Sequence, residues 1–156
     1  MKDLSTEEVA YLAGFLDGDG SINAQLIRRV DYRLGYQIRV SVTFFQKSKR
    51  NWFLLNWQKR LGVGTVRTRN DNISEFALVG TQIVRPFLEK IRSYTELKTK
   101  QIDIILEICN KLSKNQSSED FIQLCEKVDL LEDLNDSKKR KVRAAEVKDY
   151  LAGNKN

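Results

Sequence analysis

Histidine is absent from this sequence, and cysteine and proline are scarce. The 156 residues contain no His, two Cys and one Pro. Without His, the chain cannot form a Ser-His-Asp or Cys-His nucleophilic triad, a His-ligated zinc site, or the active site of a nuclease with a His general base. Cys109 and Cys125 are too few for a Cys₄ zinc site, and both lie in apolar stretches, so we expect buried, reduced thiols.

Long apolar runs are absent as well. No stretch approaches the ~18 residues of a membrane span, so we expect no membrane partner. The acidic N-terminus resembles neither a secretory signal nor an Arg-rich transit peptide. The length and a hydrophobic content of 41% fit one globular domain. We predict a single domain over residues 1–156, with a core over residues 5–112 and with C-terminal helices and a basic arm over residues 117–156.

Acidic side chains are scarce in the middle of the chain. Residues 24–100 carry sixteen basic and five acidic side chains, and residues 138–156 carry seven and two, whereas residues 101–137 are net acidic. The overall net charge is +6. Concentrated Lys and Arg indicate a polyanionic partner, with nucleic acid as the first candidate. The alternative from charge alone is a soluble basic protein without such a partner.

Hydrophobic periodicity predicts an α+β chain with the order α-ββ-α-ββ-α followed by further helices. Apolar residues three and four apart predict helices, and alternation predicts strands with one buried face. Ser5 and Glu8 form a capping box at the start of the first helix. The predicted elements are helices Thr6–Asp17, Ser48–Leu61, Thr81–Arg92 and Thr95–Leu112, one more helix opening at Ser117, and strands Ser21–Val30, Tyr36–Phe45, Thr65–Arg69 and Ile73–Val79.

One face of the predicted sheet is rich in Asn, Gln, Arg, Ser and Thr. An ordinary solvated strand face would hold more Lys and Glu, whereas these side chains hydrogen-bond to base edges and phosphates. The outward-facing candidates for base contacts are Asn23, Gln25, Arg29, Gln37, Arg39, Ser41, Thr43, Arg67, Arg69 and Glu75. Lys138, Lys139 and Lys141 are candidates for phosphate contacts, which add affinity without sequence information.

The first helix carries a stripe of small residues, Ala10, Gly14 and Gly18, spaced four residues apart. Small residues at this spacing leave a groove in which two helices can approach backbone to backbone. Gly inside a helix costs about 1 kcal/mol relative to Ala, which favours a packing reason for Gly14. We therefore predict that the stripe packs against another helix.

The same helix leads into two carboxylates, Asp17 and Asp19, separated by a glycine. We expect Asp19 just past the helix end, where the dipole is negative and a carboxylate is unfavourable unless a cation is bound. Mg²⁺ and similar hard ions take carboxylate and carbonyl oxygens as ligands. The alternative is that both Asp residues only shape a Gly-rich turn.

The segment Leu12–Gly20, with the sequence LAGFLDGDG, resembles the signature of the LAGLIDADG homing endonucleases. Six of its nine residues are identical to that signature, and the predicted order of elements is that of the family. The resemblance extends over residues 6–143 and points to the single-motif subfamily, whose members act as homodimers. Because no second copy of the motif is present, a complete site then requires a second chain.

The resemblance implies roles for particular residues of the site. Asp19 falls on the metal-binding carboxylate of the motif, and the Gly18 carbonyl is a candidate additional ligand. Gln46 falls on the Gln that helps to place water, and Lys98 falls on the Lys that polarises the water or the phosphate. Arg50 falls on an Arg that follows the Gln position. The catalytic set is therefore expected to be Asp19, Gln46, Arg50 and Lys98, whereas Asp17 is expected to be structural.

The resemblance predicts a site-specific endonuclease that hydrolyses double-stranded DNA at a long pseudo-palindromic site with Mg²⁺ or Mn²⁺. In the implied homodimer, the first helices pair through Ala10, Gly14 and Gly18, and each sheet lies over the DNA major groove. The implied compartment is intracellular, in a chloroplast or mitochondrion if the gene is intron-encoded there.

The same motif is compatible with two other functions. The alternative is an RNA maturase, a splicing cofactor that keeps the fold while its catalytic residues can decay; the presence of Asp19, Gln46 and Lys98 favours the enzyme. A non-catalytic DNA-binding regulator would need an added helix-turn-helix domain, for which 156 residues leave no room.

Overall fold

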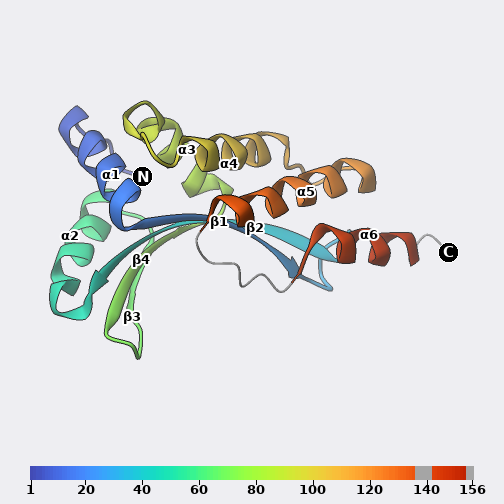
Figure 1. Cartoon of the computed structure of the whole chain (residues 1–156), viewed down its shortest axis with the longest axis horizontal. Coiled ribbons are helices and arrows are strands. Elements are labelled where there is room, and N and C mark those ends of the chain that lie inside the picture. The colour runs from blue at the N-terminus through green and yellow to red at the C-terminus, as the bar shows by residue number, and fades with distance from the viewer. Residues whose placement is uncertain (136–141, 154–156) are drawn as a thin grey trace.

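The computed structural model describes residues 1–135 and 142–153, and these form the predicted α-ββ-α-ββ-α order followed by further helices (Figure 1). The candidate phosphate contacts Lys138, Lys139 and Lys141 lie outside the described residues. In chain order the elements are α1 (Thr6–Asp19), β1 (Gly20–Arg28), β2 (Tyr36–Lys47), the 3₁₀ turn η1 (Ser48–Arg50), α2 (Asn51–Leu61), β3 (Thr65–Thr68), β4 (Ile73–Val79), α3 (Thr81–Ile91), the 3₁₀ turn η2 (Arg92–Tyr94), α4 (Thr99–Lys111), α5 (Ser118–Leu134) and α6 (Ala144–Gly153).

The four strands form one antiparallel sheet with the order β1-β2-β4-β3. β1 and β2 form a hairpin that runs from Gly20 opposite Phe44 to Arg28 opposite Tyr36. β4 pairs with β2 only over residues 41–47, the half nearer to α1. The outer half of the hairpin, defined here as residues 24–28 and 36–40, is therefore a two-stranded ribbon that extends beyond the rest of the sheet.

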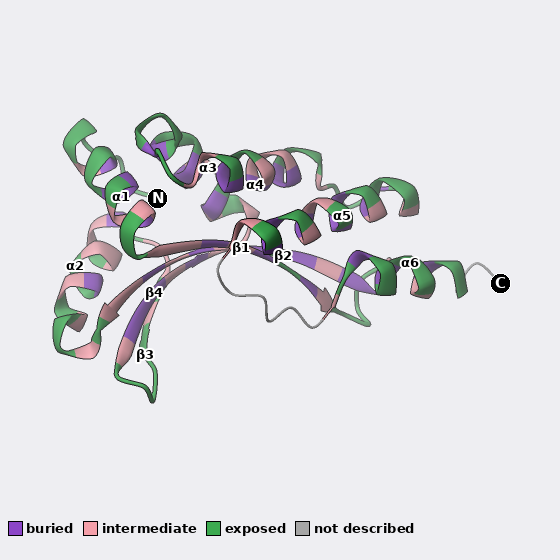
Figure 2. Ribbon diagram, in the orientation of Figure 1, coloured by how far each residue is buried: buried purple, intermediate pink, exposed green. Residues whose placement is uncertain are grey.

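Alternation along the strands turns apolar side chains to one face, as predicted. Ile38, Val40, Val42 and Phe44 of β2 are buried, and helices α1, α3, α4 and α5 cover this face of the arched sheet (Figures 1 and 2). Complete burial of such a side chain contributes about 1.5–3 kcal/mol, so the apolar set fixes which face turns inward. Among the described residues, no helix is both long and apolar enough to cross a membrane.

Two predicted helix boundaries were wrong, and at both of them a contact distant in sequence contributes. α1 continues to Asp19 instead of ending at Asp17, because the Lys98 ammonium and the Gly20 amide bond to carbonyls of its last turn. α4 begins at Thr99 instead of Thr95, because residues 96–98 are held in a loop by α1. Asp19 is thus the last residue of the helix and does not lie beyond it.

The C-terminal segment differs most from the sequence prediction. A basic arm was expected, but residues 144–153 form α6, which packs on α5. Its buried residues Ala144, Val147 and Leu151 are three and four positions apart, which is the helical spacing that the prediction overlooked.

Both cysteines are buried, as predicted. Burial raises the pKa of the Cys109 thiol to about 11 and that of the Cys125 thiol to about 12. Both thiols are therefore protonated at neutral pH and belong to the core.

Candidate active site

Three of the predicted catalytic residues form one hydrogen-bonded chain at the C-terminal end of α1. Gln46, near the end of β2, donates from Nε2 to the Asp19 carboxylate over 3.2 Å. Arg50, in η1, donates from Nε to the Gln46 Oε1 over 2.7 Å. The guanidinium can only donate, so it fixes the orientation of the Gln46 amide and directs its NH₂ group toward Asp19. Asp19 and Arg50 are exposed and Gln46 is half-buried, so a ligand can reach the chain.

Lys98 reaches the same end of α1 from the loop that precedes α4. Its ammonium donates to the Asp17 carbonyl over 2.6 Å. α1 has no basic residue in its own last turn, so Lys98 supplies the cation that a helix C-terminus favours. All four predicted catalytic residues are thus brought to the last turn of α1.

Asp17 holds the loop that carries Lys98. Its Oδ2 accepts hydrogen bonds from the backbone amides of Glu96 and Leu97 over 2.8 and 3.2 Å, and its Oδ1 accepts from the Lys98 amide over 3.1 Å. These bonds join residues that are 79 to 81 positions apart in the sequence. The structural role predicted for Asp17 is therefore to anchor the loop of residues 96–98 to α1.

Replacing Asp17 with Ala is expected to lower the free energy of unfolding by about 1–3 kcal/mol. The substitution removes the acceptor for three backbone amides, and a polar group that loses its partner carries the desolvation cost. Chemical denaturation measures the loss. Asp133→Ala, at an exposed position of α5, is the control and should change the value by at most about 0.5 kcal/mol. Equal values for the two variants would contradict the anchoring role.

The donor chemistry near Asp19 fits a hard divalent cation. The carboxylate is exposed, and among residues 1–135 and 142–153 Gln46 is the one hydrogen-bond donor to it, which leaves further lone pairs available. The Gly18 carbonyl lies among the last four of the helix, which lack partners within it. Such oxygens are the ligands that Mg²⁺ and Ca²⁺ take. Within the described part of the chain, no group of three or more His, Cys, Asp or Glu side chains is arranged so that it could hold a metal ion.

The small-residue stripe of α1 faces away from its own chain. Ala10, Gly14 and Gly18 are exposed, and a Cβ atom built on either glycine would meet no atom within 4 Å. Tyr11, which follows Ala10 on α1, is 53% exposed; its ring lies 6.3 Å from that of Phe53 in α2, whose neighbour Trp52 is 61% exposed. An exposed apolar patch of this kind marks an interaction surface.

The open face of the sheet carries the predicted base-contacting residues. Gln25, Arg29, Arg39, Arg67 and Arg69 are exposed, and Asn23, Gln37, Ser41 and Thr43 are half-buried. Because the apolar set points to the helices, the polar residues of this set within the strands share the opposite face, whereas Arg29 and Arg69 lie just beyond β1 and β3.

Glu75 lies on the outward face of the sheet, as predicted, but its side chain is covered by its neighbours. It is only 8% exposed, because the Arg67 guanidinium hydrogen-bonds to its Oε1 and Arg69 lies 3.9 Å from its Oε2. The two guanidinium groups cover the carboxylate. Its predicted contact with a base stays a prediction.

Comparison with known proteins decides the family. The family model described as LAGLIDADG endonuclease matches residues 12–111. The chain belongs to the LAGLIDADG endonuclease family. The resemblance predicted from residues 12–20 is thereby confirmed.

The relatives of this LAGLIDADG chain include two algal DNA endonucleases. The chain is 44% identical to I-CvuI of Chlorella vulgaris, over 91% of this chain and 88% of that protein. It is 37% identical to I-CreI of Chlamydomonas reinhardtii, over 93% of this chain and 89% of that protein. I-CvuI solved in complex with the I-CreI target superposes with a TM-score of 0.88 at 42% identity and covers 94% of both chains. The predicted α+β homing-endonuclease fold is confirmed.

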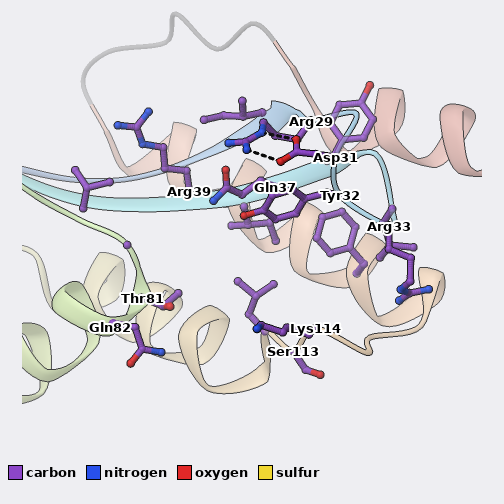
Figure 3. A pocket seen from close by; sticks show the side chains of 18 of the residues that line it. Arg29, Asp31, Tyr32, Arg33, Gln37, Arg39, Thr81, Gln82, Ser113 and Lys114 are labelled. Atoms are coloured by element: carbon purple, nitrogen blue, oxygen red, sulfur yellow. Dashed lines mark hydrogen bonds and ion pairs between the residues drawn. The ribbon is translucent and has the colours of Figure 1, made fainter.

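A groove of about 1070 Å³ lies beside the outer half of the hairpin, away from Asp19 (Figure 3). Its walls come from the hairpin turn, the start of α3 and the loop after α4. Arg29 donates to both carboxylate oxygens of Asp31 here, and these bonds hold the pKa of Asp31 below its ordinary value. The groove has no local signal in the sequence, because its lining comes from segments far apart in the chain; the Arg33 guanidinium, for example, bonds to the carbonyl of Gln116, which is 83 residues away.

Proposed function

We propose that this LAGLIDADG chain acts as a homodimer that cuts both strands of a long pseudo-palindromic DNA site. One observation carries the proposal: the exposed stripe of α1 ends at the exposed carboxylate of Asp19, with Gln46, Arg50 and Lys98 around it. The stripe on which a second helix can pack and the carboxylate that can bind a cation thus lie on the same helix, α1. One chain supplies half of this arrangement.

The dimer follows from the surface of α1. Two copies that pack through Ala10, Gly14 and Gly18 can bring their backbones close, because these positions present no bulky side chain. Leu97, which is 76% exposed in the loop next to Lys98, extends the apolar area at the same end. Pairing about a two-fold axis would bring the two Asp19 carboxylates together. A two-fold dimer matches the two halves of a pseudo-palindromic site.

DNA would lie against the open face of the sheet. Arg pairs bidentately with guanine, and Asn and Gln pair with adenine. The polar side chains of β1 and β2 on the open face, from Asn23 to Arg39, can therefore read bases directly. Arg67 and Arg69 extend the basic surface on β3 and the turn after it. I-CvuI was solved in complex with the I-CreI target and with its own target, which supports DNA as the ligand.

Hydrolysis would occur at the paired Asp19 carboxylates, with Mg²⁺ or Mn²⁺ as the proposed ions. Asp19 and the Gly18 carbonyl would hold the ion, which when bound lowers the pKa of water and stabilises the leaving oxygen. Structures of the relative I-CvuI were solved in the presence of Mg or Ca, which supports a divalent metal. Gln46 would orient the attacking water with its NH₂ group, since Arg50 fixes that amide.

Lys98 would stabilise negative charge on the phosphate. Its ammonium donates a hydrogen bond to the carbonyl of Asp17, two residues before Asp19. The ammonium has further N–H donors available for a ligand oxygen. Charge developing at the transferring phosphate is stabilised by such preorganised cations. The RNA maturase alternative is not favoured, because the curated relatives are DNA endonucleases.

Selection from a randomised DNA library tests the function. Purified protein with Mg²⁺ is expected to enrich one pseudo-palindromic sequence with breaks at fixed central positions. Excess EDTA is expected to abolish cleavage, and Mg²⁺ or Mn²⁺ added beyond the chelator should restore it, since oxygen ligands hold the ion reversibly. Cleavage that persists in EDTA would contradict the metal mechanism. Enriched but uncut DNA would contradict the enzyme and favour a binding protein.

A further inference from the structure

The outer half of the β1–β2 hairpin has little support from the sheet itself. β4 stops pairing at Ser41, so residues 36–40 have β1 as their neighbouring strand. Isolated two-stranded ribbons are marginally stable in water. Yet this half carries Gln25, Gln37 and Arg39, which are proposed base contacts, and Arg29 follows directly after it. Something besides the sheet must hold these side chains in register with the DNA.

Tyr150 of α6 packs against the last rung of this ribbon. Its ring lies 5.4 Å from the Tyr36 ring in an edge-to-face arrangement with an interplanar angle of 82°. The Arg28 guanidinium lies 5.2 Å from the centroid of the Tyr150 ring. Arg28 and Tyr36 are paired in the ladder, so one aromatic ring contacts both strands where the ribbon ends.

The chain leaves room for this ring at Gly35. A Cβ atom there would lie 2.3 Å from Cε1 of Tyr150, and the residue has a φ of +70°, which non-glycine residues rarely adopt. Glycine therefore serves both the turn and the close approach of α6 to the hairpin.

α6 is itself firmly fixed to the helical layer. The Ala144 amide donates to the Asp129 carboxylate over 2.9 Å, and the Arg143 guanidinium lies 2.7 Å from the Glu132 carboxylate. α5, which carries both acidic residues, packs on β1. In Figure 1, α6 accordingly lies beside the outer end of the hairpin.

Tyr150 contacts the hairpin on the face of the sheet that the helices cover. Arg28 and Tyr36 share the alternation of buried Leu26 and Ile38, so their side chains lie on the helical side. The candidate base contacts point the opposite way. The ring can therefore influence DNA recognition only by positioning the strands, without contacting DNA.

We propose that α6 is a brace that holds the outer half of the hairpin through Tyr150 and thereby sets how strictly the outer base pairs of each half-site are read. Tyr150 is a positioning residue, and the inference rests on the proposed function. β1 starts beside Asp19 and its nine residues extend about 26 Å, or about eight base pairs along B-DNA. The base pairs concerned are therefore the ones farthest from the cleavage site.

Amide hydrogen exchange on the DNA-free protein tests the brace first. Tyr150→Ala is expected to speed exchange about tenfold in residues 24–28 and 36–40, because it removes the aromatic and cation–π contacts of the ribbon. Exchange in residues 41–47, which β4 supports, should not change. Tyr150→Phe keeps the ring and should behave as wild type. Unchanged exchange in the outer half, or Phe behaving as Ala, would overturn the brace.

Cleavage of single-base-pair variants of the selected target tests the consequence. In Tyr150→Ala, discrimination in kcat/KM should fall about tenfold at the outer positions and stay constant at the central ones. Tyr150→Phe should restore it, and Ile105→Val, a buried truncation in α4, controls for a general loss of stability. A uniform loss at all positions would overturn the proposal. If the wild-type protein cuts no DNA, the proposed function fails, and hydrogen exchange still decides whether the brace exists.

Discussion

Asp19→Asn is expected to abolish DNA cleavage while leaving the fold and DNA binding largely intact. Asn keeps the size of the side chain and an oxygen that can accept the Gln46 hydrogen bond, so the chain from Gln46 to Arg50 can persist. It removes the negative charge that holds a divalent cation. Because metal activation of water and of the leaving oxygen is lost, kcat should fall about a thousandfold or more.

Cleavage and binding must be measured separately for this variant. Cleavage is followed on a plasmid that carries the selected site with Mg²⁺, and binding is followed by gel shift with Ca²⁺ in place of Mg²⁺. Glu126→Gln removes a carboxylate from an exposed position of α5, on the helical layer, and should leave both quantities unchanged. Equal losses of binding and cleavage in Asp19→Asn would instead indicate a structural role for Asp19.

The strands and their faces could be predicted from the sequence because alternation is a local signal. Each buried residue of β2 is two positions from the next, so one strand alone determines which side chains turn outward. The boundaries of α1 and α4 could not be predicted in the same way. They depend on Asp17 and Lys98, whose contacts join segments about 80 residues apart. Periodicity carries no information about such distant partners.

The residues of the candidate site likewise divide into those with a local signal in the sequence and those without one. Asp19 had a local signal, since a carboxylate at a helix C-terminus is unfavourable unless a cation compensates it. Gln46, Arg50 and Lys98 had none, because a single Gln, Arg or Lys is usually a solvated residue, and the family resemblance alone selected them. The structure brings all three to the end of α1. The burial of Glu75 escaped prediction because it depends on two arginines of the neighbouring strand and turn.

Gly14→Leu is expected to separate folding from assembly. In a single chain Gly14 is exposed and a Cβ there meets no atom within 4 Å, so a side chain can extend from this position toward solvent. Leu is also the better helix former by about 0.8 kcal/mol, which favours α1 itself. In the proposed dimer the same side chain would stand between two α1 helices and prevent their close approach. The variant should therefore fold as a monomer.

Loss of the dimer should remove DNA cleavage together with assembly, because each chain supplies one Asp19 to the proposed site. Sedimentation velocity should report half the wild-type mass, circular dichroism should report native helix content, and cleavage should fall at least about a hundredfold. Ala145→Leu makes a similar enlargement at an exposed position of α6 and should leave mass and cleavage unchanged. A Gly14→Leu protein that stays dimeric and cuts DNA would place the interface elsewhere. A monomer that still makes double-strand breaks would show that one Asp19 suffices, and the reason for the stripe would then lie outside catalysis.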